Sequence, residues 1–142
     1  MRTARQLLSL KPQGVASIGP DETVYEALKL MAEKGVGALL VLDGGKLVGI
    51  LSERDYARKV ILKGKSSHEL QVREIMTDRV VYVETRHTTE ECMAVMTDKH
   101  IRHLPVFEGE QLVGVLSIGD LVKETISQQE FIIRQLENYI MS

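Results

Sequence analysis

The chain has 142 residues, which is enough for one compact domain or for two small units that share a core. Its residues are 44% hydrophobic and 27% charged, and a net charge of −2 gives no overall electrostatic reason to bind nucleic acid or an anionic membrane. An apolar run of the ~20 residues that span a bilayer is absent, and the single cysteine, Cys92, excludes an internal disulfide and suits the reducing cytoplasm, where we expect the protein.

The opening residues MRTARQLLSLK are basic and contain no acidic residue, as in organelle-targeting segments. The apolar pair Leu7-Leu8 is far too short for a secretory signal. Repeat structure begins soon afterwards, so we assign this segment to the first repeat.

The first repeat alternates strand and helix patterns. Its predicted elements are, in chain order, a strand over 15–18, a helix from Thr23 to Gly35, strands over 38–42 and 47–51, and a helix that begins at Ser52. Thr23 and Glu26 fit a capping box, and Gly35 suits the left-handed end of a helix. Asp43-Gly44-Gly45 predicts a hairpin turn between the two strands. The polar stretch 62–69 is expected to be an exposed linker.

The second repeat gives the same order of elements. They are a strand over 80–83, a helix that begins at Thr88, strands over 103–107 and 112–116, and a longer helix from about Ser117 to Tyr139. Residues 15–60 align with 80–125 without a gap, and 14 of the 46 positions are identical. Such a repeat predicts two copies of one supersecondary unit.

We therefore predict an α+β fold, in which two β-α-β-β-α repeats pack with pseudo-twofold symmetry and form two equivalent clefts. The repeats are assigned to residues 1–67 and 68–142. Apolar residues beyond the repeat, such as Phe131 and Leu136, cover more than one face of the last helix. They pack either on the protein's own sheets or on a second subunit, and we favour a homodimer.

One short phrase occurs twice, as GILSERD at 49–55 and GVLSIGD at 114–120. In each copy a strand leads into a helix start, with Ser52 and Asp55 in the first and Ser117 and Asp120 in the second. Free backbone N–H groups at a helix start suit a phosphate. A carboxylate accepts two hydrogen bonds and so suits a sugar diol.

The strand glycines Gly49 and Gly114 permit close approach by a ligand or by another backbone. Arg54 adds a fork of donors for phosphate. The alternative is that each Ser-x-x-Asp is only a helix cap, worth about 1 kcal/mol.

The doubled β-α-β-β-α order, with G-h-h-S-x-x-D opening the last helix of each copy (h is an apolar residue), resembles a tandem CBS-domain module. The stretches IRHLPV at 101–106 and LVGVLS at 112–117 are typical of this family, and SERDYARKVI at 52–61 resembles its small stand-alone members. The resemblance implies binding of an adenosine ligand in clefts between the repeats. AMP or NAD(H) is our first choice, ahead of ATP, ADP and S-adenosylmethionine, and no metal is expected to be required.

The resemblance also implies site residues. In the first site these are Val15, Ala16, Ala38, Ser52, Arg54 and Asp55. In the second site they are Val80, Val81, Arg102, His103, Leu104, Ser117, Gly119 and Asp120. The aspartates would hold ribose, the serines phosphate, and strand backbone the adenine.

The two copies differ in their basic groups. Arg54 of the first motif is replaced by Gly119 in the second. Arg102 and His103 match positions that bind phosphate in the γ subunit of AMP-activated kinase, and the cleft that they serve is left open. The difference predicts two different ligands, or one occupied and one weak site.

Other chemistry finds little support. His100 and His103 lack a carboxylate or cysteine pair at metal-ligand spacing, and Cys92 falls on an apolar helix stripe that suits an inert core thiol. The chain has no acid–base or nucleophile set and no room for a catalytic barrel of ~250 residues. We therefore predict a regulatory nucleotide sensor without enzymatic activity, read by an unknown partner protein. The alternative is a ligand-independent interaction or dimerisation module.

Overall fold

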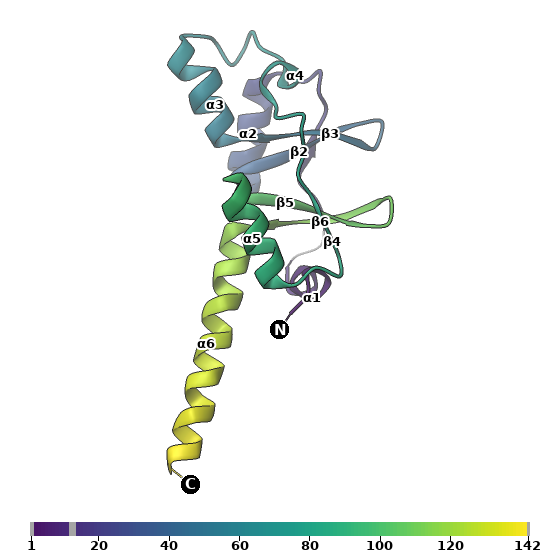
Figure 1. The fold of residues 1–142 in the computed structure, drawn as a ribbon. Helices are drawn as coiled ribbons and strands as arrows, with labels where there is room; N and C mark the ends of the chain where they lie inside the picture. Colours follow the sequence, from purple (N-terminus) through teal and green to yellow (C-terminus); the bar gives the residue numbers. More distant parts are fainter. Residues whose placement is uncertain (1, 12–13, 142) are drawn as a thin grey trace. The chain divides into compact units, whose positions relative to one another are not determined.

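The computed structural model describes residues 2–11 and 14–141, and it confirms a mixed α and β fold with two similar β-α-β-β-α repeats (Figure 1). The first half of the chain contains α1 (Ala4–Ser9), β1 (Ser17–Ile18), α2 (Val24–Lys34), β2 (Ala38–Asp43), β3 (Lys46–Ser52), α3 (Glu53–Lys59) and the 3-10 turn η1 (Ile61–Lys63). The second half contains α4 (Val72–Ile75), β4 (Val83–Glu84), α5 (Thr89–Lys99), β5 (His103–Glu108), β6 (Gln111–Ser117) and α6 (Ile118–Met141).

The elements form two compact units. The β1–β3 unit comprises residues 14–81, and the β4–β6 unit comprises residues 82–141 together with the described part of the N-terminal segment. These units differ from the sequence repeats, which we divided between residues 67 and 68. The β1–β3 unit is therefore one continuous stretch of chain, whereas the β4–β6 unit combines two separate stretches.

Backbone hydrogen bonds explain this division. Ala4 N donates to His87 O at 2.7 Å, which attaches α1 to the segment between β4 and α5 in the second repeat. Val72 N donates to Glu22 O at 2.8 Å, which attaches α4 to the start of α2 in the first repeat. The short helix that precedes each repeat thus packs within the unit of the other repeat.

Each unit has a three-stranded sheet, ordered β1-β2-β3 or β4-β5-β6. The first two strands run parallel and are connected through a helix, and the last two form an antiparallel hairpin. Gly44 and Gly45, at φ 58° and 84°, make the predicted turn of the first hairpin. The apolar faces of the sheet and helices meet in a core, which in the β1–β3 unit comprises Val24, Ala27, Met31, Leu39, Val41, Leu51, Val60, Val72 and Ile75.

The helix ends follow the sequence signals. Thr23 and Thr88 accept hydrogen bonds from the backbone N–H groups three residues later, and Gly35 ends α2 at φ 64°. His100 ends α5 in the same left-handed conformation, at φ 56°. No helix within 2–11 and 14–141 has both the length and the apolar character needed to cross a membrane.

Candidate functional site

The first serine–aspartate pair caps α3. Ser52 Oγ accepts from Asp55 N at 3.2 Å, and Asp55 Oδ2 accepts from Ser52 N at 3.0 Å and from its hydroxyl at 3.1 Å. The two residues therefore form a reciprocal capping box. The cap does not use Oδ1 of Asp55, which instead accepts from Thr77 Oγ1 at 3.3 Å and lies 3.4 Å from Lys59 Nζ.

The second pair caps α6 in the same way. Ser117 Oγ accepts from Asp120 N at 3.2 Å, and Asp120 Oδ2 accepts from Ser117 N at 2.8 Å. Again Oδ1 takes no part in the cap. Because α6 has 24 residues whereas α3 has seven, the dipole at this helix start is the stronger of the two.

Strand pairing places other predicted residues beside these caps. Ala38 lies opposite Ser52 in the β2–β3 ladder, and His103 lies opposite Ser117 in the β5–β6 ladder. Ile118 N donates to Arg102 O at 2.8 Å. The structure therefore places Arg102 and His103 in the same unit as Ser117 and Asp120, and the cleft that they serve stays a prediction.

The predicted strands that precede α2 and α5 are too long. The first was predicted to begin at Val15 and the second at Val80, but β1 begins at Ser17 and β4 begins at Val83. Val15, Ala16, Val80 and Val81 are half-buried residues just before these strands.

A proline explains why the second of these strands begins later. Leu40 N donates to Ala16 O at 3.1 Å, at the edge of the first ladder. The aligned residue in the second repeat is Pro105, which has no N–H to donate to Val81 O. The backbone at Val81 therefore lacks the bond that holds Ala16.

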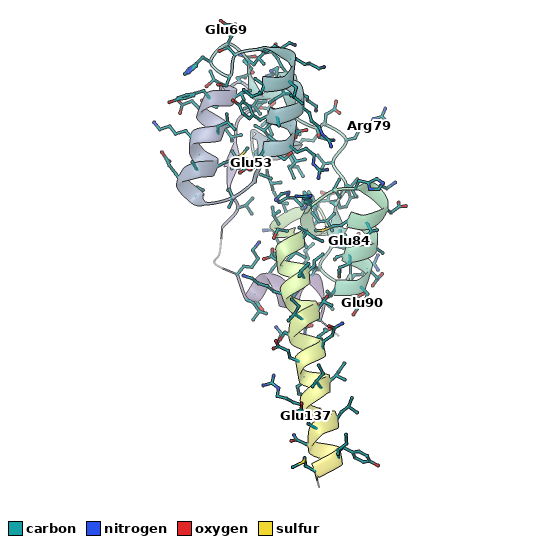
Figure 2. All side chains as sticks on the ribbon, turned by 90° about the vertical axis from the view of Figure 1, so that its left-hand side faces the viewer. Glu53, Glu69, Arg79, Glu84, Glu90 and Glu137 are labelled. Atoms are coloured by element: carbon teal, nitrogen blue, oxygen red, sulfur yellow. The ribbon has the colours of Figure 1, made fainter. Side chains whose placement is uncertain are left out.

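The remaining predicted residues differ in exposure. Arg54 and Gly119 are exposed, each as the second residue of its helix. Glu53, labelled in Figure 2, lies just before Arg54 at the start of α3. Leu104 is fully buried, so only its backbone is suited to meet a ligand.

The strand glycines receive neighbours from the protein itself. A Cβ on Gly49 would lie 2.6 Å from Met76 Sδ and 3.0 Å from Thr77 O. A Cβ on Gly114 would lie 2.7 Å from Leu8 Cδ2. Of the two reasons we gave for a glycine here, close approach by another part of the chain is the one the structure shows.

A lysine missing from the sequence prediction contacts the second pair. Lys11 Nζ donates to Asp120 Oδ2 and to Val115 O, each at 2.8 Å. Burial by itself would raise the pKa of the Asp120 carboxyl, but the hydrogen bonds from Lys11 and Ser117 outweigh burial and lower this pKa. Lys11 thus supplies a positive charge at the motif that lacks an arginine.

The contribution of Lys11 to stability should depend on pH. An aspartate with a lowered pKa stabilises the folded state above its unfolded pKa of about 3.9, and this stabilisation is lost as pH falls through the folded pKa. We expect Lys11→Met to lower the free energy of unfolding by about 1–2 kcal/mol at pH 7, with a smaller difference at pH 3. Urea unfolding at both pH values measures this. Lys29→Met, which removes an exposed lysine of α2, is the control, and equal losses for Lys11→Met at both pH values would contradict the assignment.

The sequence also raised a reactive thiol and a metal site as candidates. Cys92 is buried, and desolvation raises the pKa of its thiol to about 11, which disfavours the reactive thiolate. Among the described residues, no three His, Cys, Asp or Glu side chains gather where they could hold a metal ion.

Two β-α-β-β-α units, each with a hydroxyl–carboxylate pair at the start of its last helix, define the class of paired-repeat α+β modules. The CBS-domain family matches residues 12–62 and 72–127, so both repeats are covered. The chain belongs to the CBS-domain family and carries two CBS domains in tandem.

Solved and curated proteins agree with this membership. A structure of a protein with CBS domains from Burkholderia ambifaria MC40-6 is 52% identical, with a TM-score of 0.87, and the match covers 89% of this chain and 96% of that one. The mitochondrial CBS domain-containing protein CBSX3 of Arabidopsis thaliana is 39% identical over 125 residues, which are 84% of this chain. The match spans 61% of CBSX3.

A third relative carries metal. The structure of Hypoxic Response Protein I, described with two coordinated zinc ions, is 30% identical with a TM-score of 0.71, and the match covers 87% of this chain and 99% of that one.

Proposed function

We propose that this CBS pair is a regulatory module that binds an adenine nucleotide at its helix-start pairs and passes the binding event to a partner protein. AMP or NAD(H) is the proposed ligand, ahead of ATP, ADP and S-adenosylmethionine. The observation that carries the proposal is shared by both units: the cap uses only Oδ2 of Asp55 and Asp120. The other carboxylate oxygen lies outside the cap and offers lone pairs to the hydroxyls of a ribose, and in Asp55 this oxygen also accepts from Thr77 Oγ1 and lies 3.4 Å from Lys59 Nζ.

The charges around the second pair favour a ligand with phosphate. Lys11 lies beside Asp120, and Arg102 and His103 lie beside Ser117 in the same unit. A helix start with basic neighbours is a favourable environment for an anion. In the β1–β3 unit the corresponding groups are Arg54 and Lys59, on a shorter helix, so we propose that the two sites differ in affinity or in ligand.

Regulation without catalysis fits the composition of both sites. Each serine hydroxyl accepts from the backbone N–H of its aspartate, and each aspartate accepts from the backbone N–H of its serine, so both members of each pair are engaged in a helix cap. We propose that a cytoplasmic homodimer changes its packing when ligand binds and that a partner protein recognises this change.

The second candidate function is a ligand-independent interaction module. The reciprocal caps favour it, because they satisfy Ser52, Asp55, Ser117 and Asp120 without any ligand. In that case the pairs contribute only stability, about 1 kcal/mol for each cap.

Calorimetric titration with AMP, NADH, ATP and S-adenosylmethionine distinguishes the two functions. We expect saturable binding of at least one of AMP and NADH, accompanied by a rise in melting temperature as ligand concentration increases. Inorganic phosphate and adenine, tested separately, show whether both halves of the nucleotide are needed. No heat and no thermal shift with all four compounds at millimolar concentration would leave only the interaction module.

A further inference from the structure

The helix α6 uses one face to pack on its own unit. Leu121 and Glu124 are buried, and Thr125 and Gln128 are half-buried. Glu124 Oε1 lies 3.2 Å from Arg2 Nε, and Thr125 Oγ1 lies 3.4 Å from Met93 Sδ. These packed residues all lie in the first half of α6.

A second face of α6 is exposed along the whole helix. We call it the α6 stripe, and it consists of Val122, Ile126, Gln129, Ile133, Leu136 and Ile140. Its five apolar members are between 42% and 78% exposed. Successive members are four, three, four, three and four residues apart, which is the heptad spacing of a coiled coil.

The α6 stripe is separate from the packed face. At about 100° per residue, the centre of the stripe lies roughly 110° around the helix from Leu121 and its neighbours. The helix also continues well beyond the rest of its unit (Figure 1), where side chains including that of Glu137 project from it (Figure 2). All residues from 129 to 141 are exposed, although the family match ends at residue 127. The unit's own packing therefore does not explain the stripe.

We propose that the α6 stripe binds the same stripe of a second copy of this chain, as a parallel two-stranded coiled coil. In heptad terms Ile126, Ile133 and Ile140 occupy a positions, and Val122, Gln129 and Leu136 occupy d positions. β-branched residues at a with leucine at d favour two parallel strands. We infer that the partner of the α6 stripe is a second copy of this chain, because the same a and d residues suit both helices of such a coiled coil.

Gln129 selects the parallel orientation. In a parallel, in-register pair, Gln129 of one chain faces Gln129 of the other, and the two amides can hydrogen-bond to each other. In the antiparallel pairing that aligns all six positions, Gln129 faces Ile133, so a buried amide would have no partner.

The charges that flank the stripe do not by themselves select an orientation. The e positions are Lys123, Glu130 and Glu137, and the g positions opposite them in a parallel pair carry no charge. The antiparallel alignment, centred on residue 131, brings Glu130 close to Glu130 of the partner, where like charges repel, but it also brings Lys123 close to Glu137 of the partner, where opposite charges attract. The choice of the parallel orientation therefore rests on Gln129 and on the a and d residues.

Molar mass measured by light scattering on the full chain tests the proposal. We expect Ile133→Glu to halve the mass of the assembly, which for a simple dimer means a fall to the 15.9 kDa of one chain. Asn138→Glu adds the same charge on the opposite face of α6 and should leave the mass unchanged. A monomeric wild-type chain, or an equal mass for wild type and Ile133→Glu, would overturn the proposal.

Cysteine cross-linking tests the orientation. Under mild oxidation Leu136→Cys should form a covalent dimer at least tenfold faster than Asn138→Cys, because d positions face each other only in a parallel pair. The native Cys92 is buried and is not expected to compete. If Leu136→Cys remains uncross-linked while the double variant Ile126→Cys, Leu136→Cys cross-links, the helices are antiparallel and the proposal is wrong.

Discussion

Gly49→Ala should lower the free energy of unfolding by about 2 kcal/mol, because a methyl group there overpacks a filled site. Its Cβ would lie 2.6 Å from Met76 Sδ and 3.0 Å from the backbone oxygen of Thr77. The Met76 side chain can move, but Thr77 is fixed by hydrogen bonds in both directions with Ile50, at 2.9 and 3.0 Å. Chemical denaturation of the full chain measures the loss.

Gly37→Ala is the matched control. A Cβ on Gly37 meets nothing closer than Glu53 Oε1 at 3.9 Å. If Gly49→Ala were as stable as Gly37→Ala, the packing of Met76 and Thr77 against β3 would be wrong. Gly114→Ala should cost less than Gly49→Ala, since its close neighbour is only the side chain of Leu8.

Asp120→Asn should weaken nucleotide binding in the β4–β6 unit at least tenfold, which corresponds to about 1.4 kcal/mol. The amide retains one oxygen for the cap but loses the second oxygen and the charge. Asp55→Asn should do the same in the β1–β3 unit and leave the other site intact. Calorimetry with AMP and NADH, fitted with two sites, separates these effects.

Stability measured without ligand distinguishes binding from capping. Asp120→Asn leaves the charge of Lys11 without its carboxylate and should cost about 1–2 kcal/mol, whereas Ser117→Ala removes the hydroxyl of the cap and should cost about 1 kcal/mol. In both aspartate variants, the stability without ligand could fall while the nucleotide affinity stays at the wild-type value. That result would mean that the pairs are caps only.

Local signals in the sequence predicted most of the elements. Thr23, Thr88 and Gly35 lie where the helix signals placed them, because a cap depends on residues within one turn. The glycines after Asp43 form their turn for the same reason. The duplication then predicted two similar units, since the same local pattern folds in the same way twice.

Contacts between distant parts of the chain could not be predicted in this way. Lys11 and Asp120 are separated by 109 residues, and nothing near either one indicates the pairing. Residues 5–8 (RQLL) resemble residues 73–76 (REIM), which lie 68 positions later. This resemblance does not indicate that each short helix joins the unit of the other repeat. The late start of β4 depends on Pro105, which lies on the neighbouring strand.

The candidate site was predicted in part. The serine–aspartate pairs occupy helix starts as expected, and Arg102 and His103 lie beside one of them. Their ligand roles stay a prediction, as do those of the strand-entry residues Val15 and Val80. One signal in the sequence could have indicated Lys11. It lies three residues after Leu8, at the end of the segment 5–8 that is repeated at 73–76, just before the second repeat.

The attachment of the N-terminal segment to the β4–β6 unit has a consequence for synthesis. Lys11 leaves the ribosome more than 100 residues before its partners Val115 and Asp120. The β1–β3 unit can assemble as soon as residues 14–81 have emerged, whereas the β4–β6 unit must wait for the strands and helices that follow residue 82. Closure of so large a loop is entropically costly and slow. A chain whose translation stops early would therefore display an apolar N-terminal helix with nothing to cover it, a natural target for chaperones.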